Sequence, residues 1–103
     1  MVIVKVIYTA KAEYVVQNQT NIKQVMADLQ ALNNTGINYN ACLGADGKTF
    51  IHTAFFKSDD ERKTLNEMLS FIHFQQQLKA EGIEVPPKQE LLQLVGSSIN
   101  IFD

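Results

Sequence analysis

The 103-residue sequence contains one cysteine, two prolines and no tryptophan. The single cysteine, Cys42, excludes a disulfide within the chain, and together with two histidines it falls short of a structural zinc set. We therefore expect no metal, a reducing cytoplasmic location and a small buried role for Cys42. No apolar run approaches the roughly 20 residues of a membrane span. The N-terminus also lacks a cationic segment followed by a long apolar one, so neither a membrane partner nor a secretory leader is expected.

An excess of charge of one sign is also missing. Nine basic residues face eleven acidic ones, for a net charge of -2. Without a basic stripe, a nucleic-acid partner is not expected. The sequence also has no glycine-rich phosphate motif of either common type and no G-x-S-x-G nucleophile motif. We therefore expect no cofactor.

The first half of the chain does contain a clear strand and helix pattern. Residues 2–9, "VIVKVIYT", are β-branched and aromatic and predict a strand. Residues 13–33 carry apolar side chains at helical spacing, and Gly36 is the expected left-handed residue that ends this helix. The segments 37–43 and 49–56 alternate around "GADGK", in which Asp-Gly favours a tight turn between two paired strands.

The second half begins with another helix. Ser58 is the expected N-cap, with Glu61 placed to complete a capping box. The apolar pattern shifts near Ser70 and predicts two consecutive helical pieces. The stretch "EGIEVPPKQ", residues 81–89, is predicted to be a loop because of its two prolines, and residues 90–102 are predicted to form the last strand.

The turn at Asp46 and Gly47 sets the register of the two middle strands. It places Ala41 opposite His52 and Tyr39 opposite Ala54. Because side chains alternate along a strand, one face then carries Ile37, Tyr39, Ala41, Leu43, Phe50, His52, Ala54 and Phe56. Cys42 lies on the other face, which excludes a thiol–imidazole pair. The face with His52 is the more apolar one, and we expect it to meet the helices.

The order β-α-β-β-α-β predicts an α+β, ferredoxin-like fold over residues 1–103, taken as one domain. In this fold a four-stranded antiparallel sheet carries both helices on one face. The other face would then expose Ile51, Phe55 and residues of the first strand. Because a monomer seldom leaves such an apolar area open, we predict a homodimer in which two sheets pair face to face.

Three segments carry a resemblance to a known family: "INYNACLGADGKTFIHTAFF", "LNEMLSFIHFQQQLKAEG" and "LQLVGSS". Their layout resembles the dimeric α/β-barrel superfamily of ferredoxin-like proteins, and within it antibiotic biosynthesis monooxygenase-like proteins. The resemblance implies a dimeric barrel and a cofactor-independent oxygenase whose aromatic or quinol-like substrate supplies its own electrons. Many relatives place a tryptophan where Phe56 stands here. Haem-degrading relatives use an asparagine on the first strand, which this chain lacks.

His52 is the first catalytic candidate. In a small apolar pocket between sheet and helices it would act as a base or hydrogen-bond donor, with its pKa lowered by burial. Asn18, on the helix stripe that meets this face, would hold a polar substituent or stabilise an oxyanion, and Tyr39 would line the wall. The alternative is structural: His52 and Asn18 satisfy each other or a buried water, without catalysis.

His73 is the second catalytic candidate, because antibiotic-monooxygenase-like relatives often have a histidine at about this place. Its helical angle also fits an exposed or capping role. Phe50, Phe71 and Phe74 are candidates for binding a small apolar or aromatic ligand, or they belong only to the core. The alternative function is a non-catalytic dimeric module that binds a small ligand or a partner.

Overall fold

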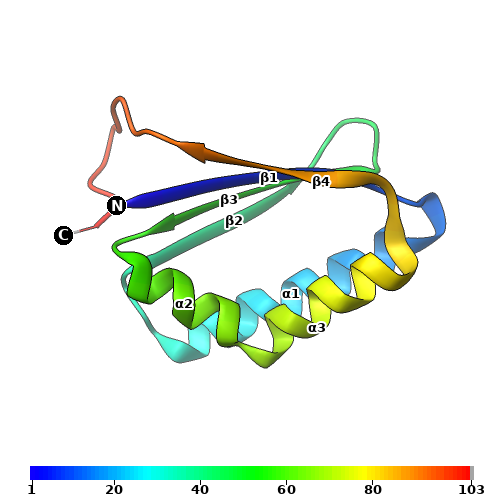
Figure 1. The fold of residues 1–103 in the computed structure, drawn as a ribbon, viewed down its shortest axis with the longest axis horizontal. Helices are drawn as coiled ribbons and strands as arrows, with labels where there is room; N and C mark the ends of the chain where they lie inside the picture. The colour runs from blue at the N-terminus through cyan, green and yellow to red at the C-terminus, as the bar shows by residue number, and fades with distance from the viewer. Residues whose placement is uncertain (103) are drawn as a thin grey trace.

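The computed structural model describes residues 1–102 and contains a four-stranded antiparallel sheet covered by helices on one face (Figure 1). The strands stand in the order β2-β3-β1-β4. In chain order the elements are β1 (Val2–Ala10), the 3-10 turn η1 (Ala12–Tyr14), α1 (Val15–Leu32), β2 (Ile37–Leu43), β3 (Thr49–Phe56), α2 (Asp59–Glu67), α3 (Leu69–Gln77), the π-helical turn η2 (Leu78–Gly82) and β4 (Ile83–Leu92). The predicted α+β, ferredoxin-like fold is confirmed.

The ends of the helices follow the prediction only in part. The left-handed residue after α1 is Asn33, with a φ of 54°, and the prediction of Gly36 was wrong. Asparagine tolerates this conformation. Gly36 has another role, because a Cβ there would lie 2.8 Å from the Cγ atom of Glu61. Ser58 does precede α2, but its hydroxyl donates to the carboxylate of Glu61 and makes no cap to the backbone.

The predicted division of the second helix is confirmed. Met68, with a φ of -69° and a ψ of 130°, is extended and separates α2 from α3. The break changes the direction of the buried side chains. Leu65 of α2 is buried and lines a small cavity together with Phe56 at the end of β3, while Phe74 of α3 stacks on His52 in the middle of that strand.

The last strand is present, but its predicted bounds were wrong. Residues 83–92 form β4, so the two prolines lie inside a strand, and residues 93–102 contain no strand. Two features make this possible. β4 is an edge strand that pairs only with β1, and its register slips between the pairs Ile7–Lys88 and Thr9–Val85. The extra residue forms a bulge around Pro86 and Pro87, where a proline removes no ladder hydrogen bond.

The hairpin of β2 and β3 has the predicted register. Ala41 lies opposite His52 and Tyr39 opposite Ala54. In the turn, Gly47 takes a positive φ of 73°. The Asp46 carboxylate accepts hydrogen bonds from the backbone N–H groups of Lys48 and Thr49. This turn fixes which β3 side chains face the helices. His52 is therefore on the inner face of the sheet.

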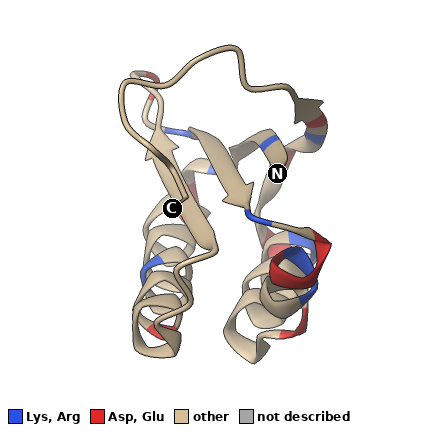
Figure 2. Cartoon of the chain, turned by 90° about the vertical axis from the view of Figure 1, so that its left-hand side faces the viewer, with Lys and Arg blue, Asp and Glu red and all other residues tan. Residues whose placement is uncertain are grey.

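The outer face of the sheet is not covered by a helix (Figure 1). Ile51 and Phe55 lie on it half-buried, and Leu92 is 40% exposed. Cys42 is exposed, so the expected burial of this thiol was wrong. Figure 2 shows acidic and basic residues side by side at the start of α2. Within residues 1–102, no helix combines the length and the apolar character of a membrane span.

Candidate functional site between the sheet and the helices

His52 lies at the centre of a hydrogen-bonded network between the sheet and α1. Its side chain is 4% exposed. The Nε2 atom lies 2.9 Å from the hydroxyl oxygen of Tyr8 on β1, and the Nδ1 atom lies 2.6 Å from that of Tyr39 on β2. The amide of Asn18, fully buried on α1, donates to the Tyr8 oxygen at 2.8 Å. Four elements thus contribute one group each, and we call these four residues the tyrosine–histidine network.

The hydrogens of this network can be assigned from the donors that are present. A neutral imidazole has one donor and one acceptor nitrogen. Because Asn18 donates to the Tyr8 oxygen, the Tyr8 hydroxyl is free to donate to Nε2. The Nδ1–H group then donates to the oxygen of Tyr39. In the other tautomer, the buried Tyr8 hydroxyl hydrogen would lose Nε2 as its acceptor and would have to turn to the amide oxygen of Asn18, which makes no hydrogen bond among the described residues. The assigned pattern leaves the Tyr39 hydroxyl hydrogen available to a ligand.

Burial keeps the titratable members of the network uncharged near neutral pH. It lowers the pKa of His52 from an ordinary 6.5 to about 4, in the expected direction. It raises the pKa of Tyr8, although the hydrogen bond from Asn18 opposes the shift, and it also raises the pKa of Tyr39. The network is therefore a chain of neutral hydroxyl and imidazole groups.

A cavity of about 540 Å³ lies beside the network. This volume falls within the range of roughly 300–1,000 Å³ that is usual for small-molecule sites. The walls come from the inner face of the sheet, from α3 and from the bulge of β4. The lining residues are Val6, Tyr8, Tyr39, His52, Phe71, Phe74, Gln75, Leu78, Lys79, Ile83, Pro86, Pro87 and Gln89.

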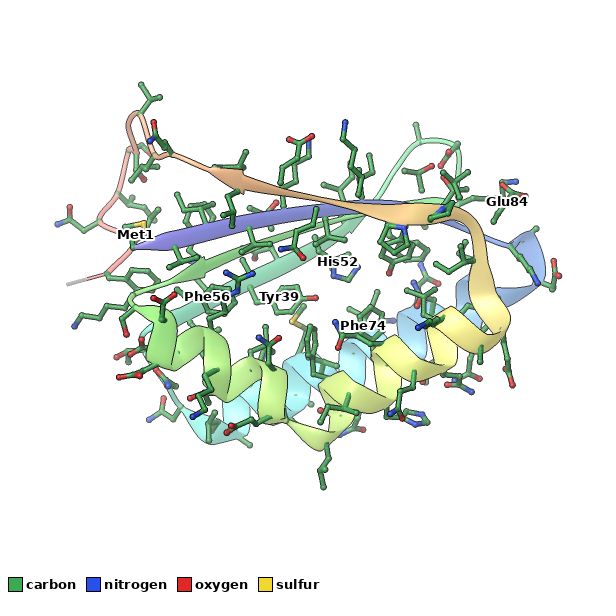
Figure 3. The ribbon with its side chains drawn as sticks, in the orientation of Figure 1. Met1, Tyr39, His52, Phe56, Phe74 and Glu84 are labelled. Atoms are coloured by element: carbon green, nitrogen blue, oxygen red, sulfur yellow. The ribbon has the colours of Figure 1, made fainter. Side chains whose placement is uncertain are left out.

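Aromatic rings hold the network side of this cavity in place. The ring of Phe74 stacks on the imidazole of His52, with centroids 5.5 Å apart and 29° between the planes. The ring of Phe71 meets Tyr39 edge-on at 6.1 Å. Figure 3 shows Tyr39 and His52 on the sheet side and Phe74 on the α3 side of the layer between them. Such a wall suits a flat aromatic ligand.

The structure brings most of the predicted site residues together. His52, Tyr39, Phe71 and Phe74 line the cavity, and Asn18 stands behind them. Phe50 is 2% exposed, and its ring stacks on the ring of Tyr8 with centroids 5.5 Å apart. Phe50 does not line the cavity, and it supports the network by packing against Tyr8.

His73 lies apart from this group. It is exposed on α3 and is not among the residues that line the cavity. The neighbouring Phe74 points inward instead. The fold therefore places the two histidines in different surroundings, one in the core and one on the surface.

Sequence reasoning missed Tyr8 and the two prolines of β4. In the structural alternative, His52 and Asn18 satisfy each other or a buried water, whereas the structure places the Tyr8 hydroxyl between them. A signal for Tyr8 was present, because it shares the parity of the inward-facing Val4 and Val6 on the first strand. Within residues 1–102, no three His, Cys, Asp or Glu side chains are grouped as a metal site.

The sequence itself matches no model of a known protein family, and it matches no curated protein either.

Solved structures do match, over nearly the full length of both chains. An antibiotic biosynthesis monooxygenase aligns with a TM-score of 0.77 at 10% identity, over 93% of this chain and 100% of the other. SnoaB, a cofactor-independent oxygenase from Streptomyces nogalater, aligns with a TM-score of 0.71 at 12% identity, over 96% and 97%. A protein of unknown function from Nitrosomonas europaea aligns with a TM-score of 0.72 at 18% identity, over 96% and 93%. This chain therefore has the ferredoxin-like fold of antibiotic biosynthesis monooxygenase-like structures, as its sequence resemblance implied.

Proposed function

We propose that this protein is a cofactor-independent oxygenase that acts on an aromatic, quinol-like substrate in the cavity beside His52. The observation that carries the proposal is the tyrosine–histidine network in the wall of an aromatic-lined cavity. The fold shared with SnoaB, itself a cofactor-independent oxygenase, supports it. A quinol supplies the electrons for the reduction of dioxygen, so the reaction does not require a flavin or a metal.

The size of the cavity suits a fused ring system. An engineered protein cavity of about 150 Å³ holds one benzene molecule. At about 540 Å³, the cavity has room for two or three fused rings. Phe71 and Phe74 would contact the faces and edges of these rings, and a substrate hydroxyl would meet the free Tyr39 hydroxyl.

Proton removal would run through Tyr39, because both ring nitrogens of His52 are already bonded to tyrosines. When a substrate hydroxyl donates to Tyr39, the hydrogen pattern assigned to the free protein reverses: the imidazole hydrogen moves from Nδ1 to Nε2, and the Tyr39 hydroxyl turns to Nδ1. Tyr39 then takes the substrate's hydroxyl proton while its own proton passes to Nδ1. The imidazolium so formed has an acceptor oxygen for each N–H group, Tyr39 on one side and Tyr8 on the other. The displaced hydrogen of Tyr8 then turns to the Asn18 amide, whose oxygen is buried without a partner in the described structure.

The low pKa of His52 sets the free energy of this step. With a pKa of about 4, charging the imidazole at pH 7 costs about 4 kcal/mol. The substrate anion forms at the same time, and it accumulates only because attraction between the two charges in a dry site offsets this cost. The network thus holds a proton only while the anion is present.

The oxygen step then balances without an added reductant. The ring carbon of the substrate anion forms a C–O bond to dioxygen, which accepts two electrons from the ring. The resulting peroxide takes the proton back from the network. Loss of one water molecule across the C–H and O–O bonds leaves a carbonyl, so a ring with one hydroxyl and one reacting C–H group combines with O₂ to give a quinone and H₂O.

Oxygen uptake measures this activity directly. We expect purified protein, in the presence of a chelator and without added flavin, to consume oxygen with at least one member of a panel of hydroquinones and anthrones. The variants His52→Ala and Tyr39→Phe should each lose most of kcat. His73→Gln, which alters the exposed histidine, is the matched control and should keep wild-type rates. The proposal is wrong if no substrate is turned over, or if His52→Ala works as fast as the wild type.

A second candidate function is a non-catalytic module that binds a small aromatic ligand. The observation in its favour is that the ring nitrogens of His52 and the Tyr8 oxygen already have partners inside the protein. For such a module, His52→Ala would leave the affinity for an aromatic ligand nearly unchanged. Isothermal titration with this variant therefore separates the two functions.

We also propose that the outer face of the sheet forms a two-fold homodimer interface. Ile51, Phe55 and Leu92 lie on that face without a covering helix. Asn38 and Asn40, joined to each other by a 2.8 Å hydrogen bond, would add polar contacts to its rim. Sedimentation at micromolar concentration should give about twice 11.6 kDa, and a species near 11.6 kDa would exclude the dimer.

A further inference from the structure

A second, smaller cavity of about 90 Å³ adjoins the first. It extends from the tyrosine–histidine network toward α2. The two cavities have six lining residues in common: Val6, Tyr39, His52, Phe71, Gln75 and Gln89. A ligand that fills the larger cavity can therefore place a substituent in the smaller one, which we call the side chamber.

The side chamber contains the chain's only arginine, Arg62, together with Asn66. These residues are four apart on α2, so they lie on one face of the helix. Arg62 is half-buried. The ion pairs of the described residues are Lys48–Glu84 and Lys88–Glu90, and neither includes Arg62. The guanidinium N–H groups of Arg62 therefore form no ion pair with a carboxylate of residues 1–102.

The charge around the two cavities has one sign. Arg62 and Lys79 are the charged residues in their linings, which contain no Asp or Glu. The absence of acidic residues from the linings does not reflect a shortage of them, because the chain has eleven acidic residues against nine basic ones. Two acidic residues of the adjacent strand β4, Glu84 and Glu90, are paired with lysines. The field in the cavities therefore favours an anion.

The volumes decide which part of a ligand goes where. The side chamber is smaller than the roughly 150 Å³ that holds a benzene ring, yet it has room for about three water molecules at about 30 Å³ each. It can therefore take a carboxylate and not a ring. Arginine is the residue best suited to bind a carboxylate, through two parallel hydrogen bonds.

We infer that the cavity takes an aromatic carboxylate, with its rings against Phe71 and Phe74 and its carboxylate in the side chamber at Arg62. This inference names the substrate class of the proposed oxygenase and rests on that proposal for its chemistry. The two are tested separately, because ligand binding and oxygen uptake are different measurements.

Isothermal titration with hydroxynaphthoate and with the matching neutral naphthol tests the inference. We expect the wild type to bind hydroxynaphthoate at least about tenfold more tightly than naphthol. Arg62→Gln should remove about a tenfold preference, or about 1.4 kcal/mol, and leave naphthol affinity within about twofold. Lys63→Gln, which removes the same charge from the next, exposed position of α2, is the matched control and should change neither affinity.

The unchanged binding of naphthol also shows that the Arg62→Gln variant is folded. The inference is overturned if the wild type does not prefer hydroxynaphthoate, if neither compound binds, or if Arg62→Gln weakens both compounds equally. If the preference for the carboxylate is present and no substrate consumes oxygen, the oxygenase proposal fails and the binding inference stands. If neutral quinols are turned over and carboxylates are not bound, the oxygenase proposal stands and the binding inference fails.

Discussion

The three tyrosines of the chain differ in how many buried partners depend on their hydroxyl groups, and Tyr→Phe substitutions should reveal this difference. The Tyr8 hydroxyl serves two buried groups, His52 Nε2 and the amide of Asn18. The Tyr39 hydroxyl serves one group within the protein, His52 Nδ1. The Tyr14 hydroxyl accepts a long hydrogen bond of 3.4 Å from Asn21.

The free energies follow from these counts. A buried polar group that loses its partner destabilises a protein by about 1–3 kcal/mol. Tyr8→Phe, with two orphaned partners, should therefore lower the free energy of unfolding by about 2–6 kcal/mol, and Tyr39→Phe, with one, by about 1–3 kcal/mol. Tyr14→Phe should lower it by about 1 kcal/mol or less, because Asn21 keeps a 2.5 Å hydrogen bond to Gln77.

Urea unfolding followed by circular dichroism measures all three variants on one scale. The protein concentration must be the same throughout, because a dimer makes the apparent stability depend on it. The expected order of destabilisation is Tyr8→Phe, then Tyr39→Phe, then Tyr14→Phe. A larger loss for Tyr39→Phe than for Tyr8→Phe would refute the assigned network, because it would mean that Tyr8 does not join Asn18 to His52.

Two further predictions concern pH and packing. Because the folded pKa of His52 is lowered from 6.5 to about 4, only the unfolded chain binds a proton there as the pH falls through this window. The free energy of unfolding should fall by up to about 3 kcal/mol between pH 6.5 and pH 4, and the His52→Leu variant should lack this component; equal pH slopes would contradict the assignment. Gly82→Ala should destabilise the fold by about 1–3 kcal/mol, because the new Cβ would overlap the buried ring of Tyr14. Gly96→Ala, with open space around it, is the control in the same unfolding assay.

The position of His52 could be predicted from the sequence because a local signal determined it. The Asp46–Gly47 turn fixes the pairing of β2 with β3, and period-two alternation then decides the face. The lowered pKa followed from burial alone. Asn18 was recognisable as a polar residue on an apolar helix stripe.

The remaining parts of the site depend on pairings between distant segments. Tyr8 meets His52 only because β1 lies between β3 and β4, and the sequence pattern of the first strand does not reveal which neighbour it touches. The strand through Pro86 and Pro87 was missed because prolines normally interrupt a ladder, whereas an edge strand with a bulge tolerates them. Both features line the cavity, so its shape could not be predicted from local patterns.

The central claim is that the tyrosine–histidine network removes a proton from a bound quinol-like substrate. Absorption spectra of a hydroxynaphthalene ligand bound under nitrogen test it without the oxygen step. The account predicts the red-shifted band of the ligand anion at pH 7 with the wild type, and the neutral spectrum with His52→Ala and with Tyr39→Phe. A neutral spectrum with the wild type, or an equal anion band with His52→Ala, would contradict it.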